Sequence, residues 1–212
     1  MASWQANHPP ERLARTWTAY RQVGDGLPAF WVANLANVGT PQPEGRWHTE
    51  GQTYAQYLSL SVTGAWCELL RFEHIRTDQA RRTIDHSLYK TTIREHDIAD
   101  LSTFDKIREA GLDVEEFVSD SLAYCQQLAG ELLRESYRGL LSPSAALHRT
   151  ETNLTLFGPR RETDKPRSKR GSYWITTEAL ANHAAPPLTT MAVTRYKGEE
   201  HEGLKHWQIK GH

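Results

Sequence analysis

The sequence predicts a single domain of the α+β class. Its 212 residues are enough for one sizeable domain, and a composition of 38% hydrophobic and 24% charged residues is that of an ordinary globular protein. Candidate strands and helices follow one another in irregular order, and no segment repeats. A doubly wound parallel sheet requires regular strand–helix–strand units, so the irregular order favours the α+β class.

The N-terminal residues predict a loose segment followed by a strand. Residues 1–14 contain Pro and Asn and are expected to form a flexible lead-in. Aromatic and β-branched residues then indicate a short strand through Trp17, Tyr20 and Val23. Gly24 is expected to end it.

The next segment predicts a strand that leads directly into a helix. Residues 29–38 suit one or two helical turns before a loop rich in Pro and Gly. Residues 54–61 form a β-compatible run, and either Ser61 or Thr63 is placed to cap a helix. Apolar side chains then recur at three- and four-residue spacing, which indicates an amphipathic helix: Val62, Trp66, Leu69 or Leu70, and Ile75.

The middle of the chain predicts one strand and two helices. β-Branched and aromatic residues favour a strand over residues 86–101. Residues 104–110 suit a short helix that stops at Gly111. Residues 114–137 are expected to form one amphipathic helix, because apolar residues recur along one side of it: Phe117, Leu122, Cys125, Leu128, Leu132 and Leu133.

The C-terminal third contains one clear strand and a tail of weaker patterns. Gly139 is expected to begin a turn, and residues 152–158 are the clearest strand in the sequence. Residues 161–212 are expected to form an extension packed on the core. The extension holds three β candidates, at residues 172–177, 190–196 and 206–210.

Charge and motifs exclude several function classes. Lys and Arg number 25 against 26 Asp and Glu, so no excess of positive charge favours nucleic acid or a membrane surface. The nucleotide-binding signatures GxGxxG and GxxxxGK[ST] are missing, as are the HExxH and GxSxG motifs of hydrolases. The histidines lack ligand spacing, so no metal is expected. Cys67 and Cys125 are expected to be buried and reduced. The sequence shows no signal peptide and no apolar segment long enough to cross a membrane, so the expected location is cytoplasmic.

Four blocks of residues, in order, resemble the RES family, which is named for an arginine, a glutamate and a serine. The longest runs from Gly45-Arg46-Trp47 through Tyr57-Leu58-Ser59 to Glu68, with Tyr57 midway between Arg46 and Glu68. Tyr20-Arg21 precedes this block. Gly139–Ala145 and Asn153–Phe157 follow it, so the resemblance covers about residues 17–157.

The chain also departs from the family pattern at three positions. His48 stands where many members have Asn, and Gln22 stands where some have an aromatic residue. Ala146 replaces the arginine that usually follows the Pro-Ser-Ala of the third block. These departures leave the substrate preference and the acceptor open.

The resemblance implies an ADP-ribosyltransferase-like fold, with a split mixed sheet flanked by helices and an NAD-binding catalytic core over residues 15–160. NAD+ is then the substrate rather than a resident cofactor. Arg21 and Arg46 suit its pyrophosphate, because a guanidinium binds phosphate oxygens in pairs. Glu68 suits the positive charge that develops on the ribose as the nicotinamide bond breaks.

Two further positions complete the implied site. Tyr57 is expected to stack on the nicotinamide or to line its slot, and with Glu68 and Arg46 it forms the expected catalytic set. Ser144 is expected to hold the nicotinamide amide or a ribose hydroxyl, with Ser142 as its rival. Taken singly, each residue also has a structural interpretation: Arg46 as an ion-pair partner, Tyr57 as a core residue, and Glu68 as an exposed residue pairing with Arg71 or His74.

The resemblance implies a toxin that degrades NAD+ by phosphorolysis, with inorganic phosphate as co-substrate, or by hydrolysis. A cognate Xre-type antitoxin is the expected partner, and a homo-oligomer is plausible. One alternative is mono-ADP-ribosylation of a protein; relatives that do this often carry an acceptor-positioning residue two positions before the glutamate, where this chain has Trp66. The other alternative is a catalytically silent module that binds a nucleotide or a partner.

Overall fold

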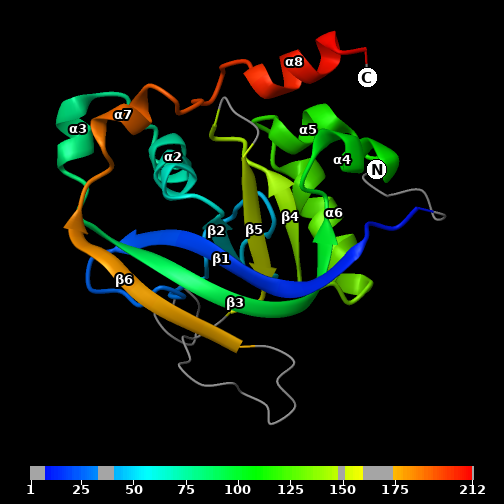
Figure 1. Cartoon of the computed structure of the whole chain (residues 1–212), viewed down its shortest axis with the longest axis horizontal. Helices are drawn as coiled ribbons and strands as arrows, with labels where there is room; N and C mark the ends of the chain where they lie inside the picture. The colour runs from blue at the N-terminus through cyan, green and yellow to red at the C-terminus, as the bar shows by residue number, and fades with distance from the viewer. Residues whose placement is uncertain (1–7, 33–40, 148–150, 160–173, 212) are drawn as a thin grey trace.

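The structure is a computed structural model that describes residues 8–32, 41–147, 151–159 and 174–211. Three long, curved strands lie side by side across one side of the molecule (Figure 1): β1 (Arg12–Gly24), β3 (His86–Asp100) and β6 (Trp174–Ala184). β3 is central and antiparallel to both neighbours. It pairs with β1 from His86 opposite Gly24 to Ala99 opposite Arg12.

Three shorter strands form the second part of the sheet: β2 (Ala55–Ser59), β4 (Gly139–Pro143) and β5 (Thr152–Phe157). β5 is central and antiparallel to both β2 and β4. The two parts join where Tyr20 of β1 pairs with Ser59 of β2, and where residues 98–100 of β3 run parallel to residues 139–141 of β4. The described strands therefore form one mixed sheet in two parts, which confirms the expected α+β class.

The helices flank this sheet in two groups (Figure 1). The first contains α2 (Val62–Phe72), α3 (Asp78–Arg82) and α7 (Leu188–Met191). The second contains α4 (Phe104–Glu109), α5 (Val114–Val118) and α6 (Ala123–Arg134), with α8 (Glu202–Ile209) beside it. No helix of the described ranges is long and apolar enough to cross a membrane.

Most expected elements of the first two thirds are present near their expected bounds. Ser61 rather than Thr63 caps α2, because the Ser61 side chain accepts the Gly64 N–H. β1 begins earlier than expected, since Leu13 pairs with Ile98 and packs on the core; residues 12–14 therefore belong to the sheet and not to a lead-in. Residues 29–32 are not helical, and the rest of the expected 29–38 turns lies outside the described residues.

The prediction of one helix over residues 114–137 is wrong. The chain leaves the helix at Ser119, whose backbone is extended, and α6 starts only at Ala123. Arginines from distant segments bind the last carbonyls of α5: Arg46 Nη1 lies 3.2 Å from Phe117 O, and Arg195 Nη1 lies 2.9 Å from Val118 O. In a continuous helix these carbonyl groups would accept hydrogen bonds from backbone N–H groups of the next turn. Here the two arginine side chains donate to them instead.

The expected turn at Gly139 is also wrong, because Gly139 begins β4. A Cβ at this position would lie 2.2 Å from the carbonyl oxygen of Thr155, so glycine is needed for close approach of β4 to β5. In the tail, neither of the other two β candidates is a strand. Residues 190–196 begin in α7 and continue beyond it, and residues 206–209 form the end of α8. Of 172–177, the described part starts β6, which extends the sheet beyond residue 160.

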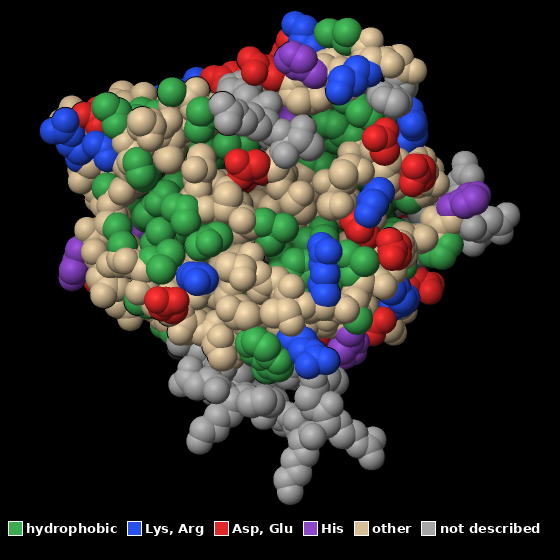
Figure 2. Space-filling view, viewed as in Figure 1, with side chains coloured by type: hydrophobic (Ala, Val, Ile, Leu, Met, Phe, Trp, Pro, Cys, Tyr) green, Lys and Arg blue, Asp and Glu red, His purple; other side chains and the backbone are tan. Residues whose placement is uncertain are grey.

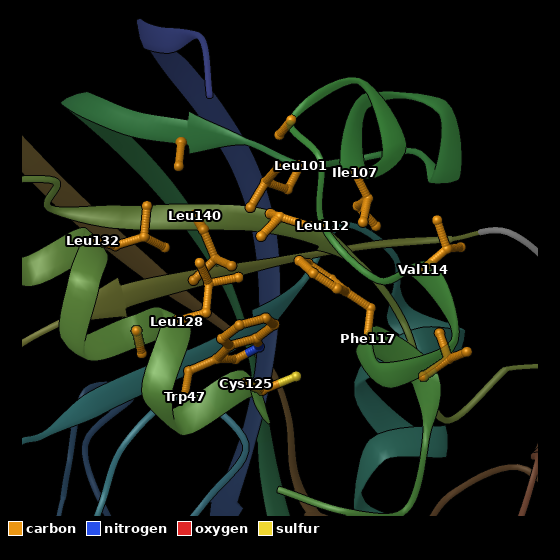
Figure 3. Packing of buried hydrophobic residues seen from close by; sticks show 14 of the residues in the cluster. Trp47, Leu101, Ile107, Leu112, Val114, Phe117, Cys125, Leu128, Leu132 and Leu140 are labelled. Atoms are coloured by element: carbon orange, nitrogen blue, oxygen red, sulfur yellow. The ribbon is translucent and has the colours of Figure 1, made fainter. Parts of the chain in front are cut away.

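The interior contains a large apolar cluster between the sheet and helices α4 to α6. Figure 3 shows the Trp47 ring beside Leu128 and Cys125 of α6, with Phe117 close by. The rings of Trp47 and Phe117 meet edge to face with centroids 5.5 Å apart. On the outside, the face in Figure 2 carries acidic and basic side chains interspersed rather than gathered by sign.

Candidate active site

Glu68 lies where α2 meets the ends of two strands. Its Oε1 accepts hydrogen bonds from Ser144 Oγ at 2.7 Å and from Asn153 Nδ2 at 2.6 Å. Glu68 is half-buried, whereas the neighbouring Ala65 and Leu69 are buried in the core. The carboxylate is thus held in one orientation by two side chains, one just after β4 and one on β5.

The sequence positions Glu68 through the start of α2. Gly64, in the first turn, lies against β2 so closely that a Cβ there would be 2.1 Å from Ser59 Oγ. Ser61 caps the helix and also donates from its hydroxyl to Glu151 beside β5. One turn later, the Glu68 carboxylate therefore reaches the ends of β4 and β5.

Ser144 is the serine that contacts Glu68. It is completely buried just after β4, and its Oγ also accepts the Ala146 N–H at 3.1 Å. Ser142 lies inside β4, where its backbone pairs with Asn153. Asn153 adds an unusual feature, because its buried Oδ1 has no hydrogen-bond partner among the described residues.

Tyr57 is fixed by its hydroxyl, which accepts the Trp47 N–H at 2.9 Å and lies 2.8 Å from His48 Nδ1. His48 Nε2 lies 2.7 Å from Pro43 O, which can only accept, so this nitrogen carries the proton. Nδ1 then accepts from the Tyr57 hydroxyl. Burial raises the pKa of Tyr57, so the hydroxyl stays protonated.

We expect Tyr57→Phe to lower the free energy of unfolding by about 1–3 kcal/mol, because the Trp47 N–H and His48 Nδ1 would lose their partner. The aromatic ring would remain in place. Urea denaturation measures the change, and Tyr54→Phe, at a half-buried tyrosine nearby, serves as the control. Equal stability of the two variants would show that the Tyr57 hydroxyl contributes nothing.

His48 makes stability depend on pH. Burial lowers its pKa below the ordinary value of 6.5, so the folded state favours the neutral ring. The resulting stabilisation is present above pH 6.5 and is lost as the pH falls through the lower folded-state value. We expect wild type to lose more unfolding free energy than His48→Gln between pH 7.5 and 5. Parallel pH curves for the two proteins would contradict this.

Within the described residues, Arg46 and Arg21 form hydrogen bonds with other parts of the chain and not with Glu68. Arg46 Nη2 donates to Ser119 O at 2.7 Å, which adds to its bond with Phe117 O at the end of α5. Arg21 donates to Gln56 Oε1 and, at 2.9 Å, to Trp31 O. Burial lowers the pKa of Arg21 to about 10, which leaves it charged at neutral pH.

Tyr57 connects the expected site residues. Arg46 directly precedes Trp47, whose N–H bonds the Tyr57 hydroxyl, and Arg21 bonds Gln56, the residue before Tyr57 on β2. The structure therefore brings Glu68 and Ser144 into direct contact and places both arginines around Tyr57. Among the described hydrogen bonds, none joins either arginine to Glu68.

A sequence model of the RES domain matches residues 12–176 of this chain, which is most of its length. The chain belongs to the RES family. The matched region of the RES domain runs from the first residue of β1 into β6 and contains all five expected site residues.

A comparison with solved structures supports the same fold. The RES domain is similar to a chain in the crystal structure of the M. tuberculosis MbcT-MbcA toxin-antitoxin complex, with 18% sequence identity and a TM-score of 0.59. The alignment covers 80% of this chain and 86% of that chain. No curated protein sequence matches the chain.

Sequence reasoning missed Asn153 as a site residue of the RES domain. The sequence places Asn153 at the start of the fourth block, Asn153–Phe157, and its position on β5 opposite Ser142 brings its amide to Glu68. A polar residue at the start of an otherwise apolar strand was the available signal. Its assignment required the pairing of β4 with β5.

Other polar groups of the RES domain lie away from Glu68. A cavity of about 510 Å³ is lined by residues 25–28, which follow β1, and by residues of β3 and β6, and none of the five expected site residues lines it. At its edge, His183 Nδ1 lies 3.3 Å from Asp25 and 3.1 Å from Asp85. These three potential metal ligands are the one such group found in the described part of the chain. They already satisfy each other, so the group gives no reason to assign a metal.

Proposed function

We propose that this protein is an NAD+-degrading toxin that breaks the bond between nicotinamide and ribose. The observation that carries the proposal is the Glu68 carboxylate, which Ser144 and Asn153 hold in one orientation. Membership of the RES family supports it, as does the likeness to a fold found in a toxin–antitoxin complex. The acceptor is inorganic phosphate or water, and the chemistry requires no metal.

Glu68 would act on the sugar. Nicotinamide leaves with the electron pair of its bond to the ribose C1′, and positive charge develops on the ring. A fixed carboxylate stabilises that charge more than water does, because it needs no reorganisation. Both described hydrogen bonds to Glu68 use Oε1. Oε2 is therefore the oxygen that we propose accepts a hydrogen bond from a ribose hydroxyl.

The acceptor then completes the reaction. An oxygen of phosphate or water forms a bond to C1′ in place of the broken bond to nicotinamide, and one proton is released to the solvent. Phosphate yields ADP-ribose-1-phosphate, whereas water yields ADP-ribose. Asn153 Oδ1, which has no hydrogen-bond partner among the described residues, is proposed to accept a second hydrogen bond from a ribose hydroxyl. The substrate would then supply the donor that this oxygen lacks.

The remaining residues would bind the rest of NAD+. Arg21 and Arg46 are proposed to bind the pyrophosphate. The ring of Tyr57 is proposed to contact the nicotinamide, and Ser144 to orient Glu68 and a bound polar group of the substrate. Because the Tyr57 hydroxyl is already bonded to Trp47 and His48, only its ring is proposed to contact substrate.

The assay incubates the purified chain with NAD+, with and without inorganic phosphate, and identifies the products by mass. ADP-ribose-1-phosphate would establish phosphorolysis and ADP-ribose would establish hydrolysis. Arg46→Ala is expected to raise KM, provided that its unfolding free energy is measured in parallel, because Arg46 also caps α5. Intact NAD+ under both conditions would refute the proposal.

A protein acceptor is less well supported. Trp66, two positions before Glu68, is buried with 2% of its surface exposed and packs against β3 and other core residues. It is therefore not placed to position an acceptor protein. Transfer of labelled ADP-ribose to a protein band would instead favour a protein acceptor over phosphate or water.

We also propose a cognate antitoxin of the Xre type that covers the site in the cytoplasm. The toxin–antitoxin complex that contains a similar fold motivates this partner. Growth arrest and loss of NAD+ on expression of the chain alone, both prevented by the antitoxin, are the expected results. Normal growth with stable NAD+ would contradict both the toxin and the partner.

A further inference from the structure

The C-terminal segment, which follows the part of the chain matched by the RES model, forms hydrogen bonds with the backbone of residues 144–146. His201 Nε2 lies 3.1 Å from Ser144 O, and Arg195 Nη1 lies 3.1 Å from Ala145 O. The backbone N–H of Arg195 donates to Ala146 O at 2.8 Å. Three consecutive carbonyls are thus bonded by two residues of the tail. Arg195 and His201 are both buried, so these bonds are shielded from water.

Arg195 also links the other elements of the site. Its Nη1 bonds Val118 O at the end of α5, and its Nε bonds Glu199 O at 2.8 Å. Arg71, one turn after Glu68 on α2, donates to Arg195 O at 3.2 Å. The segment therefore joins the helix of Glu68 to the strand end of Ser144.

These arginines are not arranged as an anion site. Asp120 Oδ1 lies 2.5 Å from Arg71 and 3.7 Å from Arg195, and their other described bonds go to backbone carbonyls. The Asp120 carboxylate already pairs with Arg71 and would repel a phosphate. Their arrangement instead fits a role in holding the chain.

His201 is itself held in one form. Its Nδ1 accepts the Leu204 N–H at 3.1 Å and caps α8, so the proton must be on Nε2. Nε2 is then the donor to Ser144 O. The start of α8 consequently orients the ring that holds Ser144, which couples the tail to the active site.

We propose that residues 194–201 are a positioning element that holds Ser144 against Glu68. The inference rests on the proposed NAD+ cleavage. Arg195 and His201 do not touch Glu68; they act through the backbone of residues 144–146, whose Ala146 N–H bonds the Ser144 hydroxyl. Without them the Ser144 hydroxyl would lose its fixed direction, and Glu68 would lose one of its two donors.

The test compares His201→Ala with His201→Gln in the full chain. We expect His201→Ala to lower kcat for nicotinamide release about tenfold while KM changes less than about twofold, because misplacement affects the reaction more than binding. Gln keeps an N–H donor for Ser144 O, so His201→Gln should recover most of kcat. His206→Ala, at an exposed histidine of the same helix, is the matched control.

Hydrogen exchange supplies a second readout that does not need activity. The Ala146 amide should exchange faster in His201→Ala than in wild type or His206→Ala, while amides of β3 remain unchanged. If wild type releases nicotinamide but His201→Ala keeps full kcat, the positioning role is wrong. If wild type is inactive, the proposed function fails; faster Ala146 exchange would still support the holding contact, and unchanged exchange would overturn it.

Discussion

Replacement of Glu68 by Gln is expected to lower nicotinamide release from NAD+ by at least about 100-fold, with little change in KM. The amide matches the carboxylate in shape and keeps an oxygen for Ser144 and Asn153, but it carries no negative charge. It therefore cannot balance the positive charge that develops on the ribose. Steady-state kinetics with a nicotinamide assay measure the effect.

The matched control for this prediction is Glu73→Gln. Glu73 is exposed at the end of the same helix, so its replacement should leave the rate unchanged. Thermal denaturation of both variants checks that neither has unfolded. Full activity of Glu68→Gln would remove the carboxylate from the mechanism and would favour the catalytically silent module.

Phe117→Ala is expected to lower the free energy of unfolding by about 3–5 kcal/mol. Phe117 is completely buried, and its ring packs on the edges of Trp47 and, at 6.3 Å between centroids, Tyr124. Removal of the ring leaves a cavity at the centre of the cluster in Figure 3. Equilibrium denaturation in urea gives the change.

Phe72→Ala is the control for the core substitution. Phe72 is 64% exposed at the end of α2, so its removal should change stability by less than about 0.5 kcal/mol. Phe117→Ala should also weaken NAD+ cleavage, because the α5 end binds Arg46. Equal stability of the two variants would mean that the cluster around Trp47 does not dominate the core.

Local patterns in the sequence were sufficient for several elements. Residues 152–158, the clearest strand in the sequence, form β5. The three- and four-residue spacing of apolar residues predicted α2, with Ser61 as one of two possible caps. These features depend on neighbours within a turn or a strand, which is the range over which a sequence pattern is informative. The motif blocks also located Glu68 and Ser144, which the structure joins by a hydrogen bond.

Contacts between distant residues decided the rest. Arg46 and Arg195 bind the end of α5 from far away in the sequence, which divides the helix expected over 114–137. Gly139 resembles a turn residue locally, yet it is a strand residue because β5 approaches it closely. A short segment such as residues 206–210, in which only Trp207 and Ile209 are apolar, suits a helix or a strand equally, and only packing distinguishes the two.

By itself, the sequence determined the α+β class, the order of most elements and the residues that mark the RES family. The tertiary structure decided which groups meet: Asn153 joins Ser144 on Glu68, the Tyr57 hydroxyl is bonded to His48, and the C-terminal tail holds the Ser144 backbone. The physical reason is that a hydrogen bond depends on positions in space. Strand pairing and core packing set those positions between residues far apart in the chain.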